Sequence, residues 1–263
     1  MAGNARRPGV SVASRVLDLL GAFDSEHPSL ILSDLARRAG LPLATAHRLV
    51  AEMVTWGALV RSPSGAYEIG LRMWDLGLLA QVPARLRQVA APFLQDLYGA
   101  TLATVHFAVR DGTLALYVDR LSGSESLQLV SRVGARLPLH ATGVGKVLLA
   151  HAPEPIRHRV FAELTPVTPY TITDPAVLDG QLARVRADGY AETREEMSLG
   201  ACSLAVPVRD REGEVVAALG LTASSVHRNA TQLVAALTVA ASGIRRGMSH
   251  RMVAPWRDHP SAQ

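Results

Sequence analysis

A sharp break separates two amphipathic helical patterns near the start of the chain. Residues 32–39 carry apolar side chains at helical spacing, and Gly40 and Pro42 then interrupt the pattern. Glycine tolerates the backbone geometry of a tight turn, and proline disfavours helix in the residue before it. Residues 43–56 predict a second helix that buries Ala46, Leu49, Val50 and Met53. Two helices joined by such a turn predict a helix-turn-helix.

The opposite face of the second helix is small, polar and basic. It carries Ala44, His47, Arg48 and Ala51, so it can approach a base-pair edge closely. The second helix of a helix-turn-helix enters the major groove of DNA, and this face is therefore predicted to read DNA. An ordinary two-helix hairpin packed on a core is the alternative that the pattern alone leaves open.

The segments on either side strengthen the DNA-binding interpretation. Residues 59–61 and 67–69 predict two short strands, joined by a Ser-Pro-Ser-Gly turn. Residues 12–23 predict an amphipathic first helix with Ser11 as its N-cap. Three helices and a two-stranded wing predict a winged helix-turn-helix domain over residues 11–70, a length common for small independent domains.

Composition bounds the rest of the chain. The 263 residues are too many for that domain alone, so a second domain is expected. Lys and Arg number 27 against 23 for Asp and Glu, a net charge of +4; arginine pairs well with phosphate, although it is also mostly solvated on ordinary surfaces. The single cysteine excludes an intramolecular disulfide and a multi-cysteine zinc site. Without a long apolar run or a signal peptide, we expect a cytoplasmic protein that does not enter the membrane.

The remainder predicts a linker and an α+β domain. Residues 71–82 are apolar nearly all round, as in a linker helix that finds burial against another subunit. Within a domain over residues 83–250, helices are predicted at about 84–100, 145–152, 176–188 and 231–248, and strands at 104–109, 114–121, 127–133, 203–208 and 215–221. Mixed helices and antiparallel strands indicate an α+β fold. Residues 1–10 and 251–263 are predicted to be a flexible arm and tail.

Four ordered blocks of sequence resemble one known family. They are DLARRAGLPLATAHRL at 34–49, LPLHATGVGKVLLA at 137–150, GY through EE to G at 189–200, and SLAVP at 203–207. On these blocks the chain resembles the IclR family of bacterial transcriptional regulators from about Ser11 to Met248. The resemblance implies a winged helix-turn-helix, a linker helix and a GAF-like α+β effector-binding domain, assembled as a homodimer or homotetramer.

The resemblance also implies DNA-binding residues. Positions that read the operator fall on Ala44, Thr45, His47 and Arg48, with Arg37 and Arg38 near the phosphate backbone. Arg61 lies in the predicted wing, whose usual contact is to phosphate. Because protein symmetry imposes operator symmetry, a dimer implies a pseudo-palindromic double-stranded DNA operator.

The implied effector pocket combines a helix start with two late strands. Its residues are His140, Ala141, Thr142, Gly143, Val144, Gly145, Thr193, Cys202, Ser203, Gly220 and Thr222, with Leu127 and Leu129 on an apolar side. The family often has aspartate at the position of Thr193, cysteine at Ser203 and serine at Gly220, so this pocket is smaller and less charged. A helix N-terminus favours an anion. We therefore expect a small organic effector with a carboxylate on a modest hydrophobic body, for example an aromatic acid derivative.

These features predict a ligand-responsive repressor of a catabolic operon. The alternative is a ligand-sensing module that acts mainly through protein partners such as RNA polymerase. No catalytic residue is expected, since Cys202 and His140 lack a nucleophile elbow and Gly143 to Lys146 lacks a complete phosphate loop. Glu195 and Glu196 are interpreted as an ion pair with a nearby arginine or as solvated carboxylates. No cofactor or metal is expected.

Overall fold

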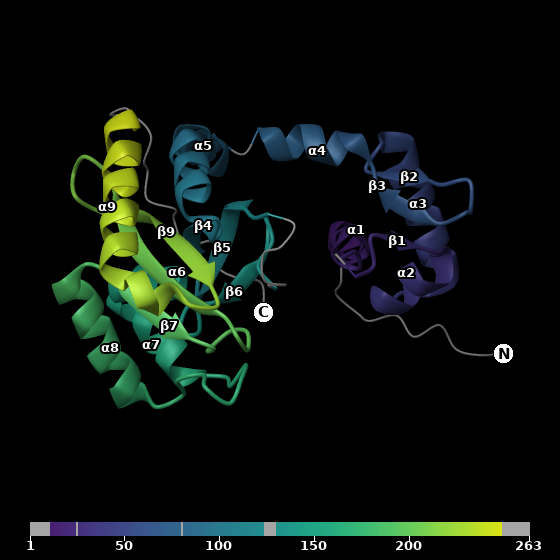
Figure 1. The fold of residues 1–263 in the computed structure, drawn as a ribbon. Helices are drawn as coiled ribbons and strands as arrows, with labels where there is room; N and C mark the ends of the chain where they lie inside the picture. The colour runs from purple at the N-terminus through teal and green to yellow at the C-terminus, as the bar shows by residue number, and fades with distance from the viewer. Residues whose placement is uncertain (1–10, 25, 80, 124–129, 249–263) are drawn as a thin grey trace. The chain divides into compact units, whose positions relative to one another are not determined.

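The computed structural model of the chain describes residues 11–24, 26–79, 81–123 and 130–248. The chain divides into two compact units, residues 1–80 and residues 81–263 (Figure 1). The segments predicted to be a flexible arm and tail, 1–10 and 251–263, lie outside the described residues, as do Leu127 and Leu129.

The first unit begins with three helices in the predicted order. They are α1 (Val12–Gly21), α2 (Leu32–Arg38) and α3 (Leu43–Trp56). The Ser11 side chain caps α1 by accepting a hydrogen bond from the Ser14 N–H at 3.0 Å. The predicted inward face of α3 is buried, and it packs with Leu19 and Leu35 into one small core. The helix-turn-helix prediction is confirmed, with α3 at its predicted bounds and α1 and α2 ending slightly earlier than predicted.

A small sheet follows the three helices. Strands β2 (Leu59–Arg61) and β3 (Tyr67–Ile69) form the predicted antiparallel wing. A third strand, β1 (Ser29–Leu30), pairs with the other edge of β3 and was not predicted, because two residues show no readable alternation. Helix α4 (Leu71–Leu78) ends this unit. It is shorter than the predicted linker over 71–82, and a new helix begins at Gln81.

The second unit is built on a six-stranded antiparallel sheet in the order β6-β5-β4-β9-β8-β7. Its strands are β4 (Thr104–Asp111), β5 (Leu114–Leu121), β6 (Arg136–Pro138), β7 (Ala191–Arg194), β8 (Cys202–Arg209) and β9 (Val215–Ala223). Its helices are α5 (Gln81–Thr101), α6 (Gly143–Ala150), α7 (Glu154–Ala162), α8 (Pro175–Asp188), the short 3-10 helix η1 (Val226–Asn229) and α9 (Ala230–Gly247). The predicted α+β class is confirmed.

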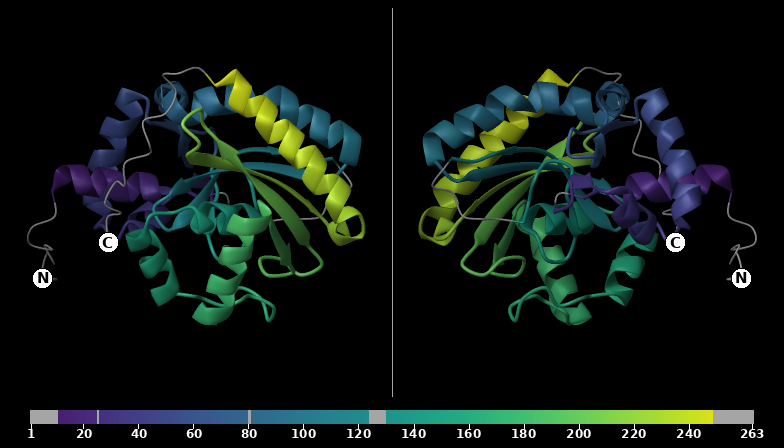
Figure 2. Two further views of the ribbon diagram at one scale, coloured as in Figure 1. Left: turned by 90° about the vertical axis from the view of Figure 1, so that its left-hand side faces the viewer. Right: turned by 90° about the vertical axis from the view of Figure 1, so that its right-hand side faces the viewer.

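Helices cover both faces of this sheet. Helices α5 and α9 lie on one face, and α6, α7 and α8 on the other (Figure 2). Alternate strand residues therefore enter different cores. Phe107 and Leu219 pack toward α5 and α9, while Ala108, Ala205 and Ala218 pack toward α6. The small side chains on the second face let α6 approach the sheet closely.

Several elements differ from the prediction. Residues 130–133, the described part of the strand expected at 127–133, form a bend and a turn rather than a strand. Strands β6 and β7 and helix α7 were missed; both strands are short, and α7 buries only Ile156 and Val160. Helix α5 begins three residues before its predicted start, so Pro83 lies in its first turn, where the missing N–H has no intrahelical partner to lose.

Candidate nucleic-acid interface and ligand cavity

The outer face of α3, formed by Ala44, His47, Arg48 and Ala51, is exposed. Thr45 lies at its flank and is partly exposed. Arg48 donates from Nη1 to Glu52 Oε1 at 2.9 Å, and both side chains are more than half exposed. Such solvated pairs contribute little free energy. The Arg48 guanidinium can therefore leave Glu52 for a phosphate or a base edge at small cost.

Two further predicted arginines are also solvated. Arg37 pairs with Asp34 at 2.9 Å on the outside of α2. Arg61 ends β2 and lies over the ring of Tyr67, with 5.7 Å between the guanidinium carbon and the ring centroid. Neither arginine is committed to the core, so both guanidinium groups are free to meet an external anion.

Arg38 has more contacts within its own unit than Arg37, and its place near the DNA backbone stays a prediction. Its Nε donates to the Ala22 carbonyl at 2.7 Å, and its Nη2 pairs with Asp24. The side chain is only 27% exposed. Asp24 is bonded on its other side, where the side-chain hydrogen bond from His27 lowers the pKa of the carboxyl to about 2. Arg38 thus ties α2 to the loop after α1.

In the second unit, a hollow lies between the sheet and the start of α6. Its empty volume is about 460 Å³, part of it open to solvent. The predicted effector residues that line it are Thr142, Gly143, Val144, Thr193, Ser203, Gly220 and Thr222. The sequence analysis missed His106, Tyr117, Ser131, Leu137 and Met197, together with Val130, Ser198, Ala201 and Leu204.

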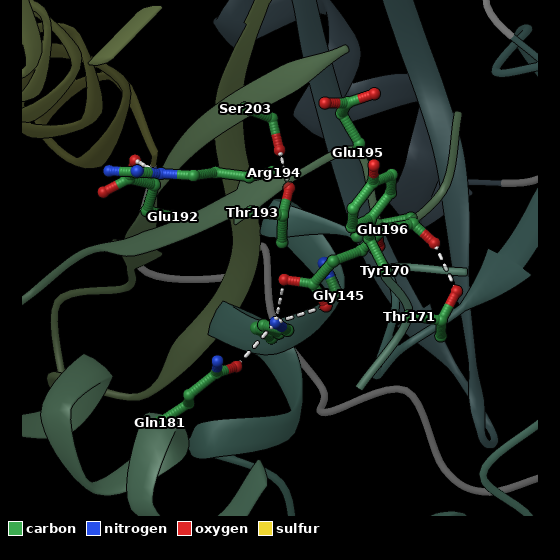
Figure 3. Close-up of polar contacts among 12 residues, drawn as sticks. Gly145, Tyr170, Thr171, Gln181, Glu192, Thr193, Arg194, Glu195, Glu196 and Ser203 are labelled. Carbon is green, nitrogen blue, oxygen red and sulfur yellow. Dashed lines mark hydrogen bonds and ion pairs between the residues drawn. The ribbon is translucent and has the colours of Figure 1, made fainter. Parts of the chain in front are cut away.

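A row of hydroxyl side chains crosses the sheet beside this hollow. Thr193 on β7 is directly opposite Ser203 on β8, Ser203 is opposite Thr222 on β9, and Thr222 is opposite Thr104 on β4. Residues paired across strands share a face of the sheet. Thr193 and Ser203 point toward one another (Figure 3) with 2.5 Å between their hydroxyl oxygens. The sheet therefore offers uncharged hydrogen-bonding groups to the hollow.

Glycines let the start of α6 approach this row. A Cβ atom on Gly143 would lie 2.6 Å from the Ser203 hydroxyl, and one on Gly220 would lie 2.9 Å from a methyl group of Val144. The Thr142 side chain caps α6 by accepting a hydrogen bond from the Gly145 N–H at 3.0 Å. The first N–H groups of the helix have no partner within the helix. They bring partial positive charge to the wall of the hollow.

His106 and Tyr117 form another wall. Their rings meet edge to face, with 5.3 Å between the centroids and 87° between the planes. Burial lowers the pKa of His106 to about 3, and the charge of Arg120 adds to this effect. Burial likewise raises the pKa of Tyr117 to about 12, which its hydrogen bond with Thr142 partly opposes. Both side chains are therefore neutral near pH 7.

Four predicted pocket residues do not line the hollow. Cys202 is on the other face of β8, in the core under α5 and α9. His140 is turned away, with its Nε2 3.0 Å from the Thr165 carbonyl oxygen. Ala141 is fully buried, and the Cα of Gly145 packs against the backbone of Leu139. Alternation in the strand and the curvature of the loop before α6 keep these four residues out of the lining of the hollow.

A buried ion pair fastens the loop above the hollow to α6. Lys146 Nζ lies 2.6 and 2.7 Å from the two carboxylate oxygens of Glu196 and 2.6 Å from the side-chain oxygen of Gln181 (Figure 3). Thr168 and Thr171 donate to the carbonyl oxygens of Glu195 and Glu196, each at 2.7 Å. The expectation of an arginine partner or solvation is therefore wrong for Glu196, whose partner is a lysine.

No group of three or more His, Cys, Asp or Glu residues could hold a metal ion within the part of the chain that the structure describes. No helix among those residues is long and apolar enough to cross a membrane.

Comparison with known proteins identifies both units. The profile described as "Bacterial transcriptional regulator IclR C-terminal" matches residues 80–246, and the "IclR helix-turn-helix domain" matches residues 12–63. The chain belongs to the IclR family. As an IclR protein it is a transcriptional regulator with a DNA-binding helix-turn-helix and a C-terminal effector domain.

Named relatives and solved structures agree with the family. The IclR regulator XynR of Escherichia coli is 32% identical over 218 residues, covering 82% of this chain and 86% of XynR. An IclR homologue from Microbacterium hydrocarbonoxydans, solved with 4-hydroxybenzoate, is 36% identical with a TM-score of 0.86; the match covers 90% of this chain and 98% of that one. The IclR protein of Thermotoga maritima is 27% identical with a TM-score of 0.74, covering 89% and 97% of the two chains.

Proposed function

We propose that this IclR regulator is a repressor of a catabolic operon that releases its operator when an aromatic carboxylate binds in the hollow of the second unit. The observation that carries the proposal is the composition of the hollow. Helix N–H groups and hydroxyls lie on one side, apolar side chains lie on another, and no charged side chain lines it among the described residues.

The start of α6 suits the anionic end of the ligand. The N–H groups at the start of this helix attract a negative charge, and Gly143 lets that start lie against Ser203. The hydroxyls of Thr193 and Ser203 add donors without a competing charge. A carboxylate satisfies all of these groups at once.

The apolar part of the lining suits the hydrophobic body of the ligand, as in many small-molecule sites. Val130, Leu137 and Met197 supply apolar contacts. The homologue from Microbacterium hydrocarbonoxydans, crystallised with 4-hydroxybenzoate, supports an aromatic acid.

Binding to a pseudo-palindromic operator requires two copies of the helix-turn-helix. The outer face of α3, with Arg37 and Arg61, supplies the contacts to DNA. Helix α4 supplies the apolar surface for assembly as a dimer or a larger oligomer. An effector can change operator affinity only if it binds the two arrangements of the oligomer with different affinity.

The test has two arms. In the first, purified protein is titrated by calorimetry with benzoate, 4-hydroxybenzoate, pyruvate and glyoxylate. We expect an aromatic acid to bind and the short acids to bind weakly, while binding of only pyruvate or glyoxylate would overturn the assignment. In the second, the protein is mixed with its own upstream DNA without RNA polymerase. A sequence-specific shift that the aromatic acid reverses supports a repressor, and the absence of any shift favours action through protein partners.

A further inference from the structure

Two side chains that line the hollow each carry a buried polar atom without a hydrogen-bond partner among the described residues. The two atoms are Nδ1 of His106 and the hydroxyl oxygen of Ser131, and both are buried. Polar groups removed from water are nearly always bonded, because an unmet donor or acceptor carries its full desolvation cost. The two side chains come from different segments, β4 and the turn before β6, yet they meet the same hollow. A ligand in that hollow can satisfy both.

We infer that His106 is the specificity-determining residue of this site, and that it recognises a hydroxyl group on the ring of the aromatic acid, with Ser131 as a second hydrogen-bonding group. This inference rests on the proposed function. It narrows the effector to hydroxylated aromatic acids and assigns the residue that distinguishes them from the unsubstituted acid.

The chemistry of His106 favours a neutral ligand group. Arg120 is directly opposite His106 on β5, and Tyr117 covers the ring edge to face. With a positive side chain opposite it and only 4% of its surface exposed, the imidazole stays uncharged. A neutral imidazole nitrogen can either accept a hydrogen bond from a phenol hydroxyl or donate one to it, depending on its tautomer. It does not form the charge-assisted bond that would hold a carboxylate.

Tyr117 lies in contact with both groups that the ligand would meet. Its ring packs on His106, and it has a side-chain hydrogen bond with Thr142 at the start of α6. We therefore expect the carboxylate of a hydroxybenzoate to meet α6 and its ring hydroxyl to meet His106.

The test compares benzoate with 3-hydroxybenzoate and 4-hydroxybenzoate by calorimetry on the full chain. A site that forms a hydrogen bond with a ligand hydroxyl discriminates strongly against the analogue without that hydroxyl. The analogue leaves the polar group of the protein without a hydrogen-bond partner. We expect one hydroxybenzoate to bind at least about tenfold more tightly than benzoate. In His106→Phe, which keeps a ring against Tyr117 but removes the nitrogen, the three affinities should converge to within about twofold.

The matched control is His151→Phe. His151 is also a partly buried histidine with an unpartnered nitrogen, but it lies at the far end of α6 and does not line the hollow. This variant should keep the preference of the parent. Thermal melts report whether each variant is folded.

Three experimental results would contradict either the role of His106 or the proposed function. Equal affinity of the parent for benzoate and both hydroxybenzoates overturns the role of His106, whether or not His106→Phe folds. Benzoate binding that tightens about tenfold in the parent as the pH falls from about 7.5 to about 5.5 also overturns it, since His106 would then hold the carboxylate as a cation. Failure of every aromatic acid to bind overturns the proposed function itself, and the inference with it.

Discussion

Arg38 and Arg48 carry the same guanidinium, but their surroundings give them different roles. Arg38 donates to the Ala22 carbonyl in a partly buried hydrogen bond and pairs with Asp24. Arg48 lies in solvent on α3 and pairs with Glu52. Removing the first leaves a buried carbonyl without its donor, whereas removing the second leaves an exposed glutamate in water. The two arginines should therefore affect different measurements.

Replacement of Arg48 by alanine should weaken operator binding by roughly 1–3 kcal/mol and leave the fold intact. The matched variant Glu52→Gln frees Arg48 from its partner, so operator affinity should be equal or higher. Arg38→Ala should instead lower the free energy of unfolding. Gel-shift titrations and urea denaturation separate these effects. Operator affinity within about twofold of the parent in Arg48→Ala would mean that the outer face of α3 does not read DNA.

The buried imidazole of His106 should make stability depend on pH. Its pKa is about 3 in the folded chain against 6.5 ordinarily, so between these values the unfolded chain takes up a proton that the folded chain does not. Stability is then lost as the pH falls through 6.5. The loss approaches roughly 1.4 kcal/mol per pH unit for one such group. Urea denaturation at several pH values should show a shallower dependence in His106→Phe, and an identical dependence would contradict this.

At the scale of elements, the start of α6 and the loop between β7 and β8 enclose the hollow from two sides. The loop contributes Met197, Ser198 and Ala201 to the lining, and the buried pair of Lys146 and Glu196 joins it to α6. Only 1% of the lysine side chain is exposed. Breaking such a pair leaves an uncompensated charge in the interior.

We expect Lys146→Met to lower the free energy of unfolding by about 3–5 kcal/mol. The double variant Lys146→Met with Glu196→Gln should recover part of this loss, because no buried charge remains. The matched control is Arg194→Met, which breaks the exposed pair with Glu192 and should change the free energy of unfolding much less than Lys146→Met. Chemical denaturation measures all three. A double variant as unstable as Lys146→Met alone would show that the charge is not the cause.

Helix α4 and the residue after it carry apolar side chains that are exposed to solvent in the single chain. Leu71 is 82% exposed, Trp74 62% and Leu79 71%. Large contiguous apolar surface on a soluble chain marks an interaction site. In the proposed function this surface lies between two copies of the chain.

The parent chain should be a dimer or larger at micromolar concentration, and Trp74→Glu should shift it toward the monomer, because a charge replaces the central aromatic residue of α4. Val177→Glu, at an exposed apolar residue of α8, is the control and should leave the assembly unchanged. Sedimentation equilibrium reports the mass of each. A parent that sediments as a monomer would exclude α4 as the interface.

The periodicity of apolar residues was sufficient to predict those helices and strands whose packing partners are near in the sequence. The bounds of α3, its inward face and the two strands of the wing were predicted correctly, since helical and alternating patterns are read within a few residues. Strand β5 was also predicted at its observed bounds for this reason. Short elements without a periodic pattern, such as β1, β6 and β7, were missed.

The surroundings of individual side chains were decided only by the tertiary structure. His106 meets the hollow because β4 lies next to β9 in the sheet, and Lys146 meets Glu196 because the loop after β7 folds onto α6. Cys202 and Ser203 are adjacent in sequence but face opposite cores, since successive strand residues alternate and a shift of one residue reverses every face. Sequence patterns determine which segments form helices and strands, whereas a binding site depends on contacts between distant segments, which only the packed chain defines.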